Sequence, residues 1–393
     1  MRITANPLRG QQFPAALLLA AAALGLLLAN VPTHDAIAQV LEARMAVPGT
    51  ALDLTVSEWV ADGLLAIFFL VVAIELRHEL THGELNSLRK AVQPAIAAGG
   101  GVLVPILIYL LIAGPASPTA AVTTVGWPIP TATDIAFALG VLAMFGRGLP
   151  SAVRVFLLAL AILDDIIGIV FIAVLFAHDV DWLMLALAVL AVAVFAVLSR
   201  VLARTGSSGL AVLMGVIGII AWGLMAVSGI HATIAGVLLG LFMSPVPAER
   251  TRHALEPTVN GVILPIFAFV AAFVVIPQVA AGDLSPAFWG ILIALPVGKI
   301  VGITLFGWLS LQLRPRGTAP ALAFPDLLAA SVLGGIGFTV SLLLAGLAFE
   351  SDAAVRDEAI LGVLGGSLIA LILSGIIVSL RARHHRAVAA AHG

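Results

Sequence analysis

Apolar runs long enough to cross a lipid bilayer recur through the whole sequence. Hydrophobic residues make up 61% of the 393 side chains and charged residues only 10%, against about 45–50% and 25% in soluble domains. A water-soluble globule is therefore excluded. A crossing needs about 20 apolar residues, so we expect a single domain over residues 1–393, an all-α polytopic membrane fold of twelve transmembrane helices. The runs lie near residues 13–29, 59–74, 92–113, 120–145, 150–177, 182–203, 209–225, 229–243, 257–275, 286–311, 325–349 and 360–380.

The distribution of basic residues predicts the orientation of these spans. Lys and Arg in short loops stay on the cytoplasmic side of a membrane, and twelve spans place all nineteen except Arg44, Arg356 and Lys299 on the side of the N-terminus. The runs at 209–225 and 229–243 are short, but joining them would move the later arginines to the other side. Both termini and the tail at 381–393 are therefore expected to be cytoplasmic. The basic residues that decide this are Arg2, Arg9, Arg77, Arg89, Lys90, Arg147, Arg154, Arg200, Arg204, Arg250, Arg252, Arg314, Arg316, Arg381, Arg383 and Arg386.

Two features near the N-terminus admit more than one interpretation. The first run follows Arg2 and Arg9 and also fits a cleaved signal peptide, but its loss would leave an odd number of spans, so we favour a retained helix. Residues 47–56 contain a Pro-Gly pair and then alternating apolar residues, which indicates a short hairpin.

The absence of cysteine excludes disulfides and thiolate metal sites. The net charge of -2 gives no basic surplus for nucleic acid.

Four ionisable residues lie halfway along three apolar runs. They are Asp134, Asp164, Asp165 and Lys299, and each costs about 2.5–3.5 kcal/mol at the centre of a membrane helix. A structural ion pair would explain two of these charges and leave two. Because intramembrane charges usually mark ion or proton pathways, we favour a functional site. Consecutive helical residues point about 100° apart, so one of Asp164 and Asp165 can face Lys299 while the other faces a cavity.

Two of the spans are predicted to be broken helices. Pro128 and Pro130 lack the amide hydrogen that a helix needs, so the helix should stop near Trp127 and restart at Thr133 and Asp134, either of which can cap the new helix. The eleventh span carries three glycines at its midpoint. Such glycines can also be packing notches, but two interruptions at one depth favour unwinding. These glycines are Gly334, Gly335 and Gly337.

Broken helices at the membrane midplane are typical of secondary transporters. Non-helical backbone at that depth must be buried in protein or line a cavity. Two crossing interruptions would bring together two positive and two negative helix ends, which Asp134 and Lys299 respectively would offset. Interruptions at matching places in the two halves also indicate an inverted repeat of spans three to five against spans ten to twelve. The residues alone therefore predict a transporter for cations or protons.

Six ordered segments resemble the NhaA-type sodium/proton antiporters, which are themselves known inverted-repeat transporters. The resemblance runs from about Phe13 to Leu380. The segments are 132–142 (ATDIAFALGVL), 163–165 (LDD), 228–236 (SGIHATIAG), 264–269 (LPIFAF), 298–299 (GK) and 334–339 (GGIGFT).

The resemblance implies a function and a role for each central residue. Asp165 would be the principal sodium-binding carboxylate, with Asp164 beside it and Thr133 and Asp134 at the helix crossing. Lys299 would pair with Asp164 when sodium is absent. Sodium, and also lithium, would compete with protons for this site in an electrogenic exchange by alternating access, activated at alkaline pH. The resemblance further implies no enzyme activity, no cofactor and no organic substrate. It implies a homodimer, formed through residues 47–56, among the lipids of the bacterial inner membrane.

Titratable residues at the predicted cytoplasmic rim are candidates for pH sensing. Charged helix rims are usually only solvated, but the resemblance places a pH-sensing cluster here, and histidine titrates in the relevant range. The chain departs from the usual pattern at His78, Arg252 and Glu256. His231 is either pH-linked or a packing histidine, and Asp62 is structural or related to ion entry. The candidates are Glu75, His78, Glu79, Glu249, His253, Glu256 and His231.

Three other function classes fit the sequence less well. An intramembrane aspartyl protease needs Tyr-Asp and Gly-x-Gly-Asp motifs, but the only tyrosine, Tyr109, precedes Leu110 and the second motif does not occur. A passive cation channel would not place a lysine at its centre and would show a filter loop. A symporter for an organic solute would need more polar groups at the midplane.

Overall fold

The computed structural model describes residues 12–32, 34–50, 52–82, 88–115, 117, 119–177, 179–278, 281–312 and 322–392. Most of them are helical, and the strands found among them form one short hairpin. Arg2, Arg9, Arg314 and Arg316, which enter the charge argument, lie outside the described residues, as do the side chains of Arg89 and Lys90.

The helices confirm a polytopic membrane fold. Within the described residues, nine helices are long and apolar enough to cross a membrane, and two more pairs of helices, each bent by about 45° at a short break, bring the number to as many as 11. Their outer faces stay apolar: Val212 and Ile219 are each 69% exposed. The number twelve remains a prediction, because α11 (Thr233–Phe242) is only 10 residues long.

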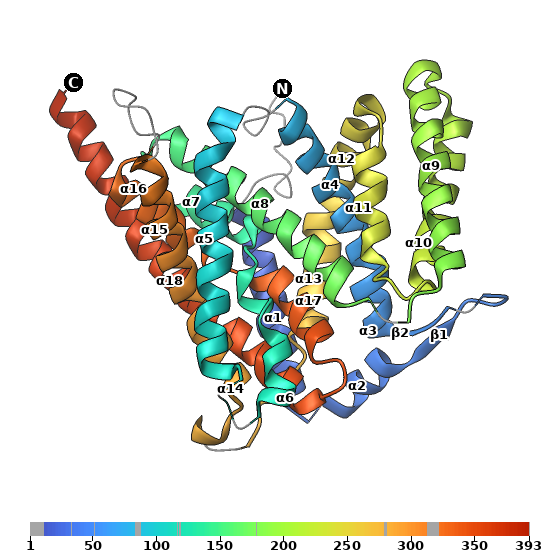
Figure 1. Cartoon of the computed structure of the whole chain (residues 1–393), viewed down its shortest axis with the longest axis horizontal. Coiled ribbons are helices and arrows are strands. Elements are labelled where there is room, and N and C mark those ends of the chain that lie inside the picture. Colours follow the sequence, from blue (N-terminus) through green and yellow to red (C-terminus); the bar gives the residue numbers. More distant parts are fainter. Residues whose placement is uncertain are drawn as a thin grey trace. The chain divides into compact units, whose positions relative to one another are not determined.

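The chain divides into two compact units, and the first comprises residues 1–9, 21–83 and 169–270. In it, α4 (Leu65–Thr81) packs against α11. The two backbones approach closely, because a Cβ on Gly240 would lie 2.6 Å from the carbonyl oxygen of Leu70. Figure 1 shows α9 and α10 side by side. The elements of this unit are the latter part of α1 (Gln12–Ala29), α2 (His34–Glu42), β1, β2, α3 (Val56–Glu58), a π-helix (Trp59–Leu64), α4, the end of α8 (Ser151–Leu175) from Ile169 on, α9 (Trp182–Thr205), α10 (Ser208–Ala226), α11, α12 (Pro245–Thr258), a π-helix (Val259–Ile263) and α13 (Leu264–Ala271).

The predicted hairpin is confirmed. β1 (Arg44–Ala46) pairs antiparallel with β2 (Asp53–Thr55), and Arg44 lies opposite Thr55. Gly49 has a φ of 80° in the connecting turn, a conformation that glycine adopts without strain. Arg44 and Asp53 form an ion pair of 3.0 Å between Nε and Oδ2.

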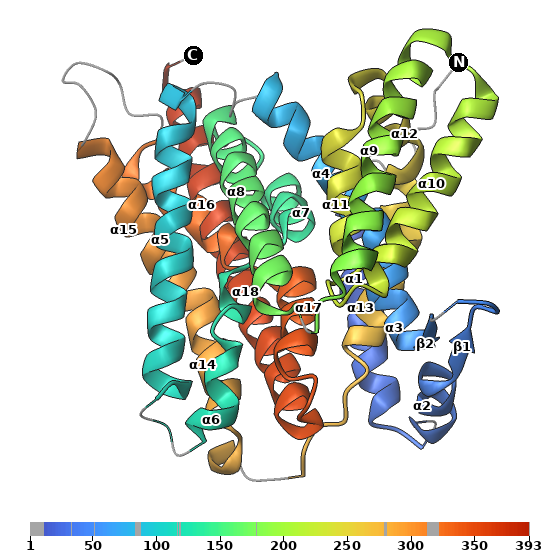
Figure 2. The same cartoon turned by 45° about the vertical axis from the view of Figure 1, so that its right-hand side comes forward.

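The second unit comprises residues 10–20, 84–168 and 271–393. Its α5 and α15 lie side by side (Figure 2), and α14 packs against α18. The unit contains both bent pairs and, on α8 and α15, the other candidate residues of the midplane site. Its elements are the first part of α1, α5 (Leu88–Ala113), α6 (Ala120–Thr123), two 3-10 turns (Thr124–Gly126 and Ile129–Thr131), α7 (Ile135–Phe145), α8 (Ser151–Leu175) as far as Gly168, a 3-10 turn (Ala281–Asp283), α14 (Pro286–Ile293), a π-helix (Ala294–Gly298), α15 (Lys299–Gln312), α16 (Phe324–Gly334), α17 (Phe338–Ala348) and α18 (Ala353–His392).

The structure changes two predicted helix boundaries and decides whether two short apolar runs form one span or two. The span predicted from residue 257 is part of a helical stretch that begins at Pro245 and ends at Ala271. Pro257 lies inside this stretch, just before its π-helical segment, whose wider turn accommodates the missing amide. The runs at 209–225 and 229–243 are separate helices, because the chain turns at Gly229 with a φ of 81°. The last span continues as a helix through most of the predicted tail.

Candidate ion-binding site

A fully buried ion pair joins α8 to α15. The Nζ atom of Lys299 lies 2.6 Å from Oδ2 of Asp164, and both side chains are 0% exposed. Burying either charge alone would be strongly unfavourable, so each is held in the interior by the other. Asp165 also acts electrostatically on Lys299.

The position of Lys299 follows from the local sequence before it. Pro296 lies in the π-helical segment, where a wider turn accommodates a residue without an amide hydrogen. Gly298 follows, and a Cβ there would lie 2.6 Å from the Cα of Pro105 on α5. This close backbone approach fixes the start of α15, and Lys299 is its first residue.

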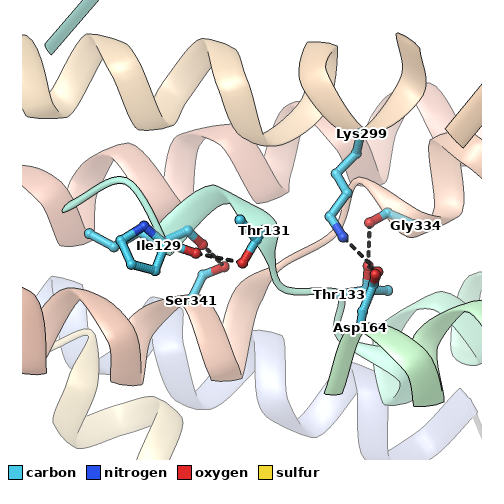
Figure 3. Close-up of polar contacts among 8 residues, drawn as sticks. Ile129, Thr131, Thr133, Asp164, Lys299, Gly334 and Ser341 are labelled. Carbon is cyan, nitrogen blue, oxygen red and sulfur yellow. Dashed lines mark hydrogen bonds and ion pairs between the residues drawn. The ribbon is translucent and has the colours of Figure 1, made fainter. Parts of the chain in front are cut away.

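Thr133 connects the ion pair to the second broken span. Its Oγ1 atom lies 2.7 Å from Oδ2 of Asp164 and 2.8 Å from the carbonyl oxygen of Gly334. Figure 3 shows Lys299, Thr133 and Gly334 gathered at Asp164. The hydroxyl has one hydrogen and therefore donates to one of these two acceptors at a time.

Asp134 joins the two half-helices that begin at the interruptions. One carboxylate oxygen accepts from the amide of Phe137 at 3.1 Å and caps α7. The other accepts from the amide of Thr339 at 3.1 Å and from its hydroxyl at 2.7 Å, in the first turn of α17. The carboxylate thus faces two positive helix ends, the place that the sequence predicted for it.

The two interruptions lie where they were predicted. The helix of the fourth span ends at Gly126 and restarts after Asp134, and that of the eleventh ends at Gly334 and restarts at Phe338. The breaks contact each other, because the amide of Asp134 donates to the carbonyl of Ile336 at 2.6 Å.

The glycines of the eleventh span also act through packing. Neither Gly335 nor Gly337 has a positive φ. A Cβ on Gly337 would lie 2.6 Å from Cδ1 of Leu295, and one on Gly334 would lie 2.7 Å from Cδ1 of Ile303. Space rather than backbone conformation therefore requires glycine, so the packing interpretation and the unwinding interpretation both apply.

One carboxylate oxygen at this site has no donor among the described residues. Oδ1 of Asp164 is buried and has no hydrogen-bond partner among the described residues. Asp165, the next residue, is 9% exposed. No three His, Asp or Glu side chains converge on one point in the part of the chain that the structure describes. A hard cation here would therefore be bound by carboxylate oxygens together with hydroxyl and carbonyl oxygens such as those of Thr133 and Gly334.

Comparison with known proteins identifies the family. The family model of the Na+/H+ antiporter 1 family matches residues 5–378. An antiporter named NhaA 2 from Clavibacter michiganensis is 50% identical over 388 residues, which cover 98% of this chain and 94% of that protein. NhaA antiporters from Tropheryma whipplei and Streptomyces avermitilis are 45% and 42% identical, over 94% and 98% of this chain and 94% and 83% of their own lengths.

The chain belongs to the Na+/H+ antiporter 1 family. Members of this family are transporters and not enzymes, need no cofactor, and carry sodium and protons rather than an organic substrate. Together with the apolar helices, this makes the protein a multi-pass bacterial membrane protein.

Six of the seven predicted pH-sensing residues of this antiporter family member lie on two contacting helices of the first unit. Glu75, His78 and Glu79 lie on α4, which contacts α12. The electrostatic neighbours of Glu75 include Arg252 and Glu256. On α12, Arg252 contacts Glu249 at 2.7 Å between NH2 and Oε1, and Nε2 of His253 lies 2.8 Å from the same Oε1. Their role in sensing pH stays a prediction.

His231 has partners for both ring nitrogens. Nε2 lies 3.2 Å from Oδ1 of Asp62, and Nδ1 lies 2.9 Å from Oγ1 of Thr233. The backbone oxygen of Asp62 accepts from the indole of Trp222 at 2.9 Å. These contacts fit the packing interpretation of His231.

Sequence reasoning did not identify two groups of residues near the broken helices. Ser341 donates to the carbonyl of Ile129 at 2.8 Å and ties α17 to the first interruption (Figure 3). Asp326, Arg381 and His385 form a cluster at the start of α16. Neither group carries a sequence signal, because serine is common in membrane helices and charged residues are common at their ends.

Proposed function

We propose that this protein exports sodium in exchange for protons, with both ions competing for Asp164 and Asp165. The observation that carries the proposal is the buried Lys299–Asp164 pair, whose second carboxylate oxygen, Oδ1, lacks a partner among the described residues. Sodium prefers several hard oxygen ligands, whereas protons remove carboxylate charge. One site therefore holds sodium or protons, and the exchange follows from this competition.

The proposed cycle begins with the site open to the cytoplasm. Proton loss at alkaline pH leaves Asp165 and Asp164 charged, and sodium enters against Asp165 while Lys299 gives up its contact with Asp164. After the site opens outward, protons displace sodium and bind to both aspartates, or to one aspartate and Lys299. More charge moves inward as protons than outward as sodium, so the exchange is electrogenic. Lithium, a hard cation of the same charge, would follow the same route.

Alternating access would come from movement of the broken helices around the midplane site. The bends of 45° and 46° support the proposed inverted repeat of spans three to five and ten to twelve, since such repeats place interrupted helices at matching positions. Twelve spans in one domain, with both termini cytoplasmic in the inner membrane, complete the proposed topology. The Arg44–Thr55 hairpin offers an exposed edge for the proposed homodimer.

The decisive experiment follows internal pH in vesicles that contain the purified protein. Adding sodium at pH 8 should move protons in wild-type vesicles, and Asp165→Asn should abolish this movement. Lowering the pH should raise the sodium concentration that gives half-maximal rate, because more carboxylates then hold protons. A wild type without sodium-driven proton movement would reject antiport. A half-maximal concentration independent of pH would reject competition at one site.

A further inference from the structure

A buried carboxylate lies at the start of α16, far from the sequence motifs. The side chain of Asp326 is only 4% exposed. Its Oδ1 atom accepts from Nε of Arg381 at 3.1 Å, and Nη2 of the same guanidinium lies 3.0 Å from this oxygen. Nε2 of His385 lies 2.9 Å and 3.1 Å from the two carboxylate oxygens. Because carboxylate oxygens are acceptors, this nitrogen carries a hydrogen.

The same stretch of α18 touches the other half-helix. Gly148, in the turn after α7, has a φ of 104°. A Cβ there would lie 2.7 Å from Cγ of Arg386 and 3.3 Å from the carbonyl oxygen of Ala382. Residues 381–386 therefore contact the outer ends of both α7 and α16, two half-helices of 11 residues each.

The inner ends of these half-helices form the candidate ion site. α16 ends at Gly334, whose carbonyl contacts Thr133, and α7 begins after Asp134. An 11-residue helix is about 16 Å long and moves as a unit, so a shift at its outer end changes the position of its inner end. The non-helical link at 335–337 leaves the direction of α16 to be set by other contacts. Arg381 and His385 provide such contacts.

We propose that Asp326, Arg381 and His385 are positioning residues for the ion site. They hold α16 at its outer end and thereby set the position of the Gly334 carbonyl relative to Thr133 and Asp164. A guanidinium that faces the carboxylate through two of its nitrogens suits this task, because its planar geometry fixes direction as well as distance. The inference rests on the proposed function, since its consequence is a change in sodium affinity.

The test compares variants of the cluster with neighbours on the same helix. Asp326→Asn keeps the shape and removes the charge, and Arg381→Gln removes the guanidinium contact. Arg383→Gln and His384→Gln are matched controls for Arg381 and His385, because both side chains are exposed on the same segment. Each variant is placed in vesicles, and the sodium concentration at half-maximal rate and the maximal rate per protein are measured at one pH.

Positioning predicts a change in sodium affinity. Asp326→Asn and Arg381→Gln should raise the half-maximal sodium concentration about 2- to 30-fold, the range of energetic coupling through packed networks. The two controls should stay near wild type. Arg381→Lys keeps the charge without the planar contact, so its half-maximal sodium concentration should lie between those of the wild type and Arg381→Gln. If Asp326→Asn does not fold, Arg381→Lys and His385→Gln, which both retain the carboxylate, carry the comparison.

Two outcomes would overturn the proposal, and a third concerns the function itself. Cluster variants with a lower maximal rate or thermal stability but an unchanged half-maximal sodium concentration would make the cluster merely structural. Control variants that match the cluster variants would assign the effect to the general positive charge of the segment. A wild type without sodium-driven proton movement would instead reject antiport, so the two failures are distinguishable.

Discussion

Burial makes the charges of Lys299 and Asp164 depend on each other. Removing one member of a buried ion pair leaves an uncompensated charge and costs about 3–5 kcal/mol. We expect Lys299→Gln and Asp164→Asn each to lower the thermal unfolding temperature in detergent, and the double variant to lower it by less than the sum. Additive losses in this double-mutant cycle would contradict the pairing.

The hydroxyl of Thr133 is expected to contribute to sodium binding. Thr133→Val keeps the shape but removes a hydroxyl oxygen of the kind that coordinates hard cations, and losing one polar contact of this kind costs about 1–3 kcal/mol. The half-maximal sodium concentration should therefore rise about 5- to 160-fold. Thr131→Val is the matched control, because Thr131 is equally buried but bonds only the nearby Pro128 carbonyl, at 2.7 Å. Equal effects of the two substitutions would argue against a ligand role for Thr133.

The midplane residues were predictable because charge is conspicuous inside an apolar run. Asp134, Asp164 and Lys299 stand out in the sequence for that reason, and the structure gathers them in one unit. Asp326 was not predictable. It lies at a helix end, where acidic residues are normally solvated, but in the fold Arg381 and His385 of α18 contact it and its side chain is 4% exposed.

At the level of elements, local chemistry predicted the breaks better than the boundaries. Pro128 and Pro130 end one helix, and Asp134 caps the next, so the fourth span could be divided from sequence. The helical stretch begins at Pro245 rather than near residue 257, where its apolar run begins, because the polar residues before Pro257 are also helical. A proline signals a helix start only when the preceding residues do not form a helix, and here a widened turn accommodates it.

The double capping by Asp134 predicts different effects for two substitutions. Asp134→Ala removes the caps of α7 and α17, and losing one N-cap alone costs about 0.5–2 kcal/mol. Asp134→Asn keeps one acceptor oxygen and should retain part of this stability. Thermal unfolding of the purified proteins would check this: the unfolding temperature should fall from the wild type to Asp134→Asn and further to Asp134→Ala. An Ala variant as stable as the Asn variant would refute the capping role.

For the whole molecule, the proposed topology can be tested on α18 alone. The sequence contains no cysteine, so a single introduced thiol is the only site for a maleimide. Ala353 and Arg383 are both exposed and lie 30 residues apart on one helix, about 45 Å, which matches a full bilayer. We expect a membrane-impermeant maleimide to label Ala353→Cys from outside the cell and Arg383→Cys only in inverted vesicles. The reverse pattern would overturn the charge-based orientation.

The single hydrogen of Thr133, lying between two acceptors, has a consequence for speed. When an incoming cation takes the Asp164 oxygen, the O–H bond turns toward Gly334, and when the cation departs it turns back. Each swap trades one hydrogen bond for another by a torsional rotation of a single light atom, without unfolding any backbone. Loading and unloading at this residue would then be limited by movements elsewhere in the protein.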